Sequence, residues 1–233
     1  MSVRRLILAT ALLLPLTAAA GGAGPPPAAT PSAELADSMA SVPGLPPVGR
    51  WMIDRDGSVA HWLGVIYEGK QLYEPINLIL VDSVSTSEAA ARSGVVAALK
   101  AAGYEVRFGH SAGYRGLIGG QSYAQLPQGR DDAFSDHPFD RSNDHGRVFG
   151  PHRIDGAFVF VGAFSRERVN LAEWPSHRFD SFDAARDAVA TGLRDRSGYA
   201  SLDYVSLGNA VGDDPATTTA DHDGRAALLR MAR

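Results

Sequence analysis

Residues 76–108 read INLILVDSVSTSEAAARSGVVAALKAAGYEVRF, and this stretch decides the fold. It begins with a nearly continuous apolar run at residues 76–81, which is typical of a strand buried on both faces. Ser85 and Glu88 then have the spacing of a capping box, which predicts the start of a helix. Residues 104–108 predict a second strand. A strand, a helix and a strand in this spacing predict a right-handed βαβ unit.

Outside this unit, hydrophobic periodicity predicts more strands and a second helix. Apolar residues at helical spacing predict the second helix over residues 180–196. Residues 109–143 are rich in glycine and form the least regular part of the body. Further strands are expected at residues 51–54, 60–67, 147–149, 157–164 and 202–207. Gly150-Pro151 and Asp155-Gly156 are predicted as turns between the strands at residues 147–149 and 157–164. Together these elements predict an α+β fold, a two-layer sandwich of a mixed β-sheet with two main helices, built around the βαβ unit.

The two ends of the chain differ in composition from this body. Residues 1–20 combine a basic start, an apolar run and a small-residue end, which is the order of a secretory signal peptide. Residues 21–47 are rich in Pro and Ala and predict a disordered linker. The folded domain is expected over residues 48–211. Residues 212–233 are predicted to be a flexible C-terminal tail, in which residues 225–233 can form one short helix.

The composition excludes several classes of function. The 233 residues carry 22 basic and 26 acidic side chains, a net charge of −4, and loss of Arg4 and Arg5 with the signal peptide leaves 20 against 26, or −6. An acidic chain without a basic run is a poor match to nucleic acid. The absence of cysteine excludes disulfides, thiolate zinc sites and thiol nucleophiles. We expect no cofactor, no membrane span after signal cleavage, and a secreted or periplasmic location.

The sequence Gly-His-Ser-Ala-Gly at residues 109–113 matches the G-x-S-x-G pattern of serine hydrolases, directly after a predicted strand. In such an enzyme Ser111 would be the nucleophile and His222 its base, which gives a serine esterase as one alternative function. The pattern requires a helix immediately after it, but the residues that follow are poor helix formers. We therefore favour a plain glycine-rich turn.

A run of carboxylates and imidazoles between Asp131 and His152 offers a second route to catalysis. Side chains of this kind can bind a divalent metal and activate water, which gives a metal-assisted phosphoester hydrolase as the other alternative. The candidate ligands are Asp136, His137 and His145. No fixed metal-binding spacing is present in the run. A polar loop whose Asp residues cap turns and pair with Arg is the interpretation we favour.

Three downstream parts of the sequence together resemble the LssY C-terminal domain family. Residues 129–134 (GRDDAF) are similar to that family's Gly-Arg-x-x-Asp-x-x-Phe stretch, with the acidic residue displaced by one position. Residues 143–149 (NDHGRVF) resemble its Arg-His-His-Val-Arg-x-Trp strand. The third part is similar to a V-G-A-A-S strand, a Thr-His pair before a helix and a D-x-E-R-D helix start. Its segments are residues 161–165 (VGAFS), 176–180 (SHRFD) and 182–187 (FDAARD).

This resemblance covers about residues 75–197 and implies an envelope-associated α/β domain. It supplies no catalytic residues, and the family has no serine motif at the position of Ser111. Asp144, Phe149 and Ala185 depart from the family's pattern, where it has His, Trp and Glu. We therefore expect an exported binding or accessory domain of the cell envelope rather than an enzyme.

A candidate ligand site can be drawn from the histidines and arginines of these segments. His145 and Arg147 alternate on one predicted strand and so face the same side of it. If the other basic residues converge on them, the group would suit a phosphate or carboxylate. The expected partner would then be a small anionic ligand or an envelope protein. For these residues themselves, the interpretation we favour is a structural network that anchors a helix to the sheet. The candidate residues are Arg130, His145, Arg147, His177 and Arg186.

Overall fold

The computed structural model of the chain describes residues 38–170 and 176–231. The predicted signal peptide and the linker up to residue 37 lie outside the described residues. The described part is a mixed α/β fold with two helices and a large mixed sheet, as predicted at this level. The helices are α2 (Glu88–Ala101) and α3 (Phe182–Arg196). The strands are β1 (Met39–Ala40), β2 (Val48–Gly49), β3 (His61–Tyr67), β4 (Lys70–Tyr73), β5 (Leu78–Asp82), β6 (Glu105–Phe108), β7 (Arg115–Ile118), β8 (Gln121–Leu126), β9 (Asp132–Ser135), β10 (Asn143–Ile154), β11 (Ala157–Asn170), β12 (Ser176–Ser181), β13 (Tyr199–Ser206), β14 (Thr217–Thr218) and β15 (Arg225–Met231).

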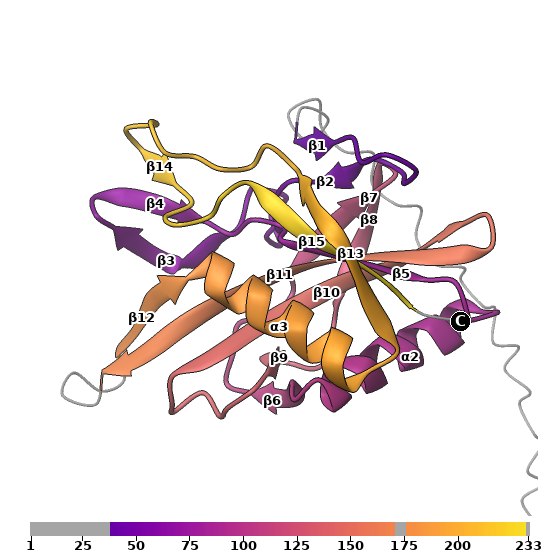
Figure 1. The fold of residues 1–233 in the computed structure, drawn as a ribbon. Coiled ribbons are helices and arrows are strands. Elements are labelled where there is room, and N and C mark those ends of the chain that lie inside the picture. The colour runs from indigo at the N-terminus through magenta and orange to yellow at the C-terminus, as the bar shows by residue number, and fades with distance from the viewer. Residues whose placement is uncertain (1–37, 171–175, 232–233) are drawn as a thin grey trace, which may run out of the picture.

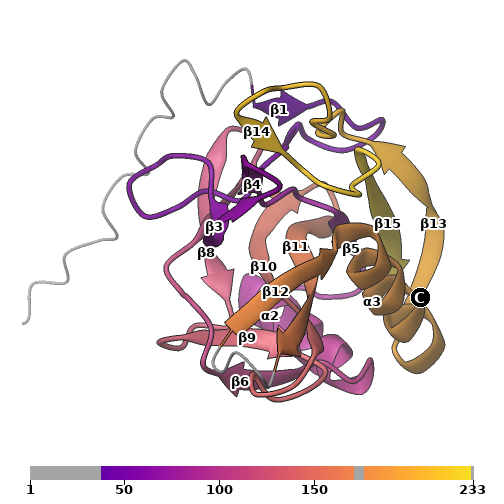
Figure 2. The same cartoon turned by 90° about the vertical axis from the view of Figure 1, so that its left-hand side faces the viewer.

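The large sheet is built on a long hairpin of β10 and β11. Its main path runs β1-β2-β7-β8-β10-β11-β5-β15-β13, with β12 paired to β11, β9 to β10 and β6 to β9. Asp155 and Gly156 form the turn of the hairpin, as predicted, since Ile154 pairs with Ala157. Gly150-Pro151, predicted as a second turn, instead lies at an irregularity within β10, and the strand continues beyond it. A separate three-stranded sheet of β14, β4 and β3 lies at the end of the molecule where β12 also lies (Figures 1 and 2).

Both helices cover one face of the sheet (Figure 1). Helix α2 begins after Ser87, whose hydroxyl accepts a hydrogen bond from the Ala90 amide, so the cap lies two residues beyond the predicted Ser85. The Ser85 amide is held by the Asp82 carboxylate in the turn that leaves β5, so the helix starts later. Helix α3 begins after Ser181, close to the predicted position. No helix among the residues that the structure describes is long and apolar enough to span a membrane.

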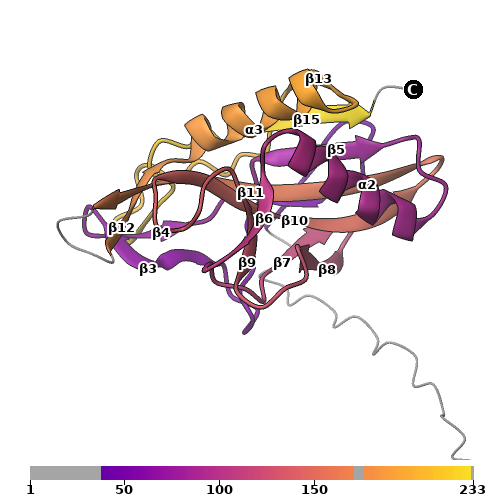
Figure 3. The same cartoon turned by 90° about the horizontal axis from the view of Figure 1, so that it is seen from below.

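Strand β5 separates two hydrophobic cores, which confirms that it is buried on both faces. Leu78 and Leu80 pack with α2 and α3, whereas Ile79 and Val81 pack on the opposite face. That second core is closed by residues of the segment from β1 to β3 and by β7. Strands β3 and β7 lie on the side of the sheet away from α3 (Figure 3). The unbroken apolar sequence of β5 follows from this position, because neither of its faces meets water.

The connection β5–α2–β6 does not join neighbouring strands. Strand β5 pairs with β11 and β15, whereas β6 pairs with β9 at the far side of the hairpin. From β5 through β11, β10 and β9 to β6 there are four antiparallel pairings, so β5 and β6 run in the same direction.

The predicted boundaries of the domain are wrong at both ends. Residues 225–231, predicted to belong to a flexible tail or a short helix, form β15, which pairs in parallel with β5 and antiparallel with β13. Leu229 of this strand is fully buried, because β15 lies inside the sheet. At the other end, β1 pairs with β2, and Ala40 and Val42 are buried in the second core. The linker predicted up to residue 47 therefore does not extend over residues 39–47.

Candidate functional site

The alternation of side chains along β10 produces two different polar groups on its two faces. Asn143, His145 and Arg147 share one face, and Asp144 lies on the other. Across the hairpin Asn143 pairs with Glu167 of β11, which brings this carboxylate to the face of His145. This is the face of the second core, opposite the helices.

Five side chains on this face form what we call the histidine cluster, namely His110, Asn143, His145, Glu167 and His177. One oxygen of Glu167, Oε1, accepts a hydrogen bond of 2.6 Å from the Asn143 amide and lies 3.0 Å from Nδ1 of His177. The same oxygen is 4.0 Å from Nδ1 of His145, and this nitrogen lies 3.1 Å from the Asn143 amide oxygen. His110 stacks its ring on that of His145, with centroids 4.6 Å apart.

Four separate segments of the chain position the cluster. His110 lies between β6 and β7, in the glycine-rich segment. Asn143 and His145 lie at the start of β10, Glu167 lies on β11, and His177 lies on β12, where it pairs with Val169. Because β10, β11 and β12 are adjacent strands, their backbone hydrogen bonds fix the relative positions of four of the five residues.

Burial sets the charge of the cluster. Burial lowers the pKa of His110 to about 4, with smaller contributions from Arg147 and His177. Burial also lowers the pKa of His145, so both rings are neutral near pH 7. The pKa of Glu167 is raised by burial, which its hydrogen bond from Asn143 opposes. Nε2 of His110 has no hydrogen-bond partner among the residues that the structure describes, and the residue is only 8% exposed, so water does not readily replace that partner.

Arg147 lies beside the cluster but is directed to other groups. One guanidinium nitrogen donates a 2.6 Å hydrogen bond to the Ser111 carbonyl, and the guanidinium lies over the Tyr114 ring, 5.0 Å from its centroid. Its Nε is buried without a partner. Burial raises the pKa of the nearby Glu74 to about 7, although the charge of Arg147 lowers it. The positive charge of Arg147 thus interacts with the Ser111 carbonyl, the Tyr114 ring and the buried Glu74 carboxyl.

The cluster therefore offers lone pairs and one carboxylate rather than a ring of positive charge. The donor atoms of His110, His145 and Glu167 all lie within 4.8 Å of one another. Two neutral imidazoles and a carboxylate suit a cation or a hydrogen-bond donor better than they suit a phosphate.

Of the five candidate ligand residues, the structure brings together His145, Arg147 and His177. The Arg130 side chain is 94% exposed and lies 3.4 Å from Asp131. Arg186 lies in another network, in which it contacts Asp183, Asp187 and Asp223 at 3.0, 2.8 and 2.6 Å. These contacts tie α3 to the segment before β15, as expected for a structural network.

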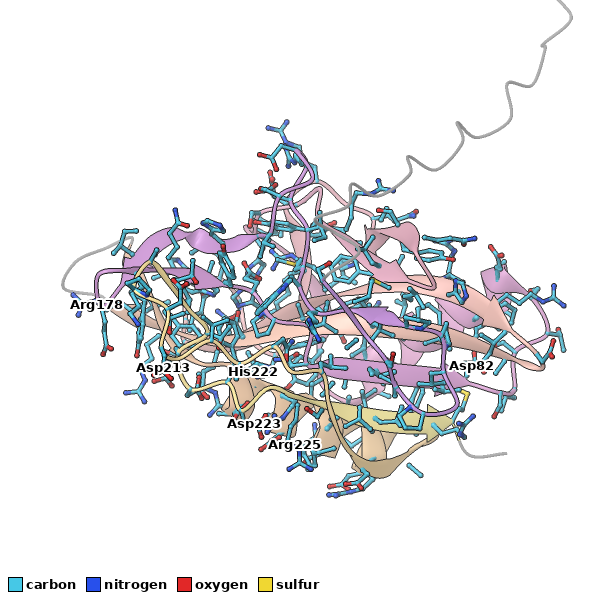
Figure 4. The ribbon with its side chains drawn as sticks, turned by 90° about the horizontal axis from the view of Figure 1, so that it is seen from above. Asp82, Arg178, Asp213, His222, Asp223 and Arg225 are labelled. Carbon is cyan, nitrogen blue, oxygen red and sulfur yellow. The ribbon has the colours of Figure 1, made fainter. Side chains whose placement is uncertain are left out.

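Ser111 and His222 do not form a catalytic pair. The Ser111 hydroxyl lies 2.8 Å from the Tyr114 hydroxyl. Both ring nitrogens of His222 are engaged, Nδ1 at 3.2 Å from Asp183 and Nε2 at 3.0 Å from the Asn209 amide oxygen. His222 lies with Asp223 just before β15 (Figure 4), and neither nitrogen is left to accept a proton from a serine.

The ligands suggested for a metal in the run from Asp131 to His152 are divided between the two faces of β10. An Asp136 oxygen accepts a 2.8 Å hydrogen bond from the Asp144 amide and lies 3.2 Å from Nδ1 of His137. Both residues line a cavity of about 510 Å³ together with Asp144. His145 instead lies in the histidine cluster, with His110 and Glu167.

His110, Asn143 and Glu167 are the members of the cluster that the sequence analysis did not name as candidate site residues. His110 is the second residue of the G-x-S-x-G pattern, in which the serine is the residue with a predicted catalytic role. Glu167 follows the family-like segment 161–165 by two residues and carries no pattern of its own. The only signal available is the register of the hairpin, which places Glu167 opposite Asn143.

No family model matches the sequence, and no curated protein or solved structure shows significant similarity to it. The likeness to the LssY C-terminal domain family therefore depends on the short motifs alone, and the function has to be argued from the geometry of the site.

Proposed function

We propose that the protein is an exported binding or accessory domain of the cell envelope, of the LssY C-terminal type, and that the histidine cluster is its ligand site. The family-like segments support this, because His145 lies in the second segment and His177 in the third, and both belong to the cluster. In this proposal the sheet and its two helices are the layers of an α+β sandwich, and β5–α2–β6 is its βαβ unit.

The observation that carries the proposal is the unpaired Nε2 of His110. A buried polar group without a hydrogen bond costs about 1–3 kcal/mol, and native proteins contain few of them. Here the unpaired nitrogen lies among two more histidines and a carboxylate, so several polar side chains are buried at one place. A ligand that engages this nitrogen would offset the cost, whereas a purely structural cluster would satisfy it internally.

Stability measurements on two histidine variants test this proposal without knowledge of the ligand. His110→Leu removes the unpaired nitrogen, and we expect the free energy of unfolding of the ligand-free chain to stay equal or to rise. The matched control is His222→Leu, because His222 is also buried but both of its nitrogens are hydrogen-bonded. We expect this control to lose about 1–3 kcal/mol. An equal loss in both variants would show that His110 is structural.

Export is tested separately by cell fractionation and intact mass. We expect the chain in the periplasm or the medium, with its N-terminus at Gly21 after cleavage behind residue 20. Recovery of the chain from the cytoplasm with Met1 to Ala20 still attached would contradict the proposed location.

Metal-assisted phosphoester hydrolysis is the second candidate function, because His145 of the run from Asp131 to His152 lies beside His110 and Glu167. The test is turnover of bis-p-nitrophenyl phosphate by the full chain with added Zn²⁺ or Mn²⁺. Turnover that disappears in Glu167→Gln but persists in Ser111→Ala would support the metal route. Turnover that survives Glu167→Gln would place any activity outside the cluster.

A further inference from the structure

We propose that His110, His145 and Glu167 bind one divalent transition metal of the zinc class. The inference rests on the proposed function in one respect, namely that it uses the same site. It goes further by naming the chemical class of the ligand.

The positions of the donor atoms carry the inference. Ligand atoms about 2.1 Å from a tetrahedral zinc ion lie roughly 3.4 Å from one another. The donor atoms of His110, His145 and Glu167 already lie within 4.8 Å of one another. Because the His110 and His145 rings are stacked, with 25° between their planes, binding requires these two rings to turn so that a nitrogen of each points at the same ion, together with side-chain shifts that shorten the donor–donor distances.

The chemistry of the donors selects the class of metal. Two imidazole nitrogens and a carboxylate oxygen suit Zn²⁺ and its first-row neighbours, whereas Mg²⁺ and Ca²⁺ prefer oxygen ligands alone. The chain has no cysteine, so thiolate cannot take part. Three protein ligands leave a fourth position for water or for a group from a partner.

Asn143 and His177 hold the ligands as positioning residues. The Asn143 side chain bridges two of them, because its amide nitrogen donates to Glu167 and its oxygen lies 3.1 Å from His145 Nδ1. The His177 ring contacts the same Glu167 oxygen at 3.0 Å. Partners of this kind fix the tautomer and orientation of metal ligands.

A second group with similar donors differs from the histidine cluster, because its carboxylates are already paired with a cation of the chain. The donor atoms of Asp183, His222 and Asp223 also lie within 4.8 Å of one another. There the Arg186 guanidinium contacts both carboxylates, at 3.0 and 2.6 Å, and supplies the positive charge from within the chain. The nitrogen of His110 has no such internal partner, and this difference assigns the metal to the histidine cluster.

The test is titration of the metal-free full chain, prepared without a histidine tag, with ZnCl₂ in a calorimeter near neutral pH. We expect saturation at one Zn²⁺ per chain and a rise in the melting temperature. His110→Leu and Glu167→Gln should each weaken binding more than about 100-fold, and Asn143→Ala by roughly 10- to 100-fold. His137→Gln, at the exposed histidine on the other face of β10, is the control and should bind as the wild type does.

Substitution with Co²⁺ gives a second readout, because nitrogen and oxygen ligation produces visible absorption bands that depend on the same residues. Circular dichroism confirms that each variant is folded before it is titrated. Absence of saturable binding to the wild type, or binding that is lost in His137→Gln and kept in His110→Leu, would overturn the metal assignment. If metal binding fails while His110→Leu remains as stable as the wild type, the binding-site proposal stands and another ligand is required.

Discussion

The stability of the protein should depend on pH through one buried carboxyl, that of Glu74. This residue lies between β4 and β5 and is only 6% exposed. Burial raises its pKa from 4.5 to about 7, Arg147 lowers it and Asp54 raises it. Tyr114, whose own pKa is raised by burial and by the charge of Glu74, is the other titratable group affected. Glu74→Gln keeps the shape of the side chain and removes its titration.

The direction and size of the effect follow from proton linkage. Between the pKa of 4.5 in the unfolded chain and the value of about 7 in the folded protein, the folded state holds a proton that the unfolded state releases. Stability therefore falls as pH rises through this range and is constant above it. A difference of about 2.5 in pKa corresponds to a loss of about 3 kcal/mol by roughly pH 8.

The assay is urea unfolding of wild type and Glu74→Gln at a series of pH values from about 5 to about 8. Other carboxyls cancel in the comparison, so the advantage of the variant should grow by about 2.5 kcal/mol from about pH 5 to about pH 8, because part of the loss has already occurred at the lower end of this range. Glu68→Gln, at an exposed glutamate, is the control and should follow the wild type. Parallel curves for wild type and Glu74→Gln would show that the carboxyl is not buried as described.

Three further substitutions test the fold. Leu229→Ala should cost about 2–5 kcal/mol in denaturant unfolding, because β15 lies inside the sheet, and a loss below about 0.5 kcal/mol would indicate a peripheral tail. Asp144→His introduces the residue of the LssY-like pattern and breaks the bidentate ion pair with the half-exposed Arg166. The free energy of unfolding should fall by about 1–3 kcal/mol in calorimetry, whereas Zn²⁺ should bind as it does to the wild type. Gly116→Ala would place a Cβ 2.6 Å from the Phe149 ring, which should lower the free energy of unfolding by about 1–3 kcal/mol, measured as a lower melting temperature of the variant.

Local patterns in the sequence predicted the elements in which burial follows one regular pattern from the first residue to the last. The run at residues 76–81 is apolar because both faces of β5 are covered, and α3 has apolar residues at helical spacing because one side of it packs on the sheet. In each case the local pattern and the tertiary environment agree, so one sequence window is sufficient.

Strand β15 shows why local patterns fail elsewhere. Its sequence, RAALLRM, consists of residues with high helix propensity, and a helix or a flexible tail is the natural interpretation. The strand forms because β5 and β13 offer backbone hydrogen bonds on both sides, and β5 is about 150 residues away in the sequence. Strand formation depends on such neighbours more than on intrinsic preference, and no local window contains them.

The histidine cluster was only partly predictable because an irregularity in β10 changes the register of the hairpin. Ile154 pairs with Ala157, and counting back from this turn without interruption would pair Glu167 with Asp144 and would place His145 on the face of the helices. The register shifts by one residue between Phe149 and His152, around Gly150-Pro151, so Glu167 pairs with Asn143 instead. Because the extra residue lies in β10, it brings His145 rather than Asp144 to the face of Glu167. The glycine and proline that resemble a turn in the sequence are thus what assembles the candidate metal site.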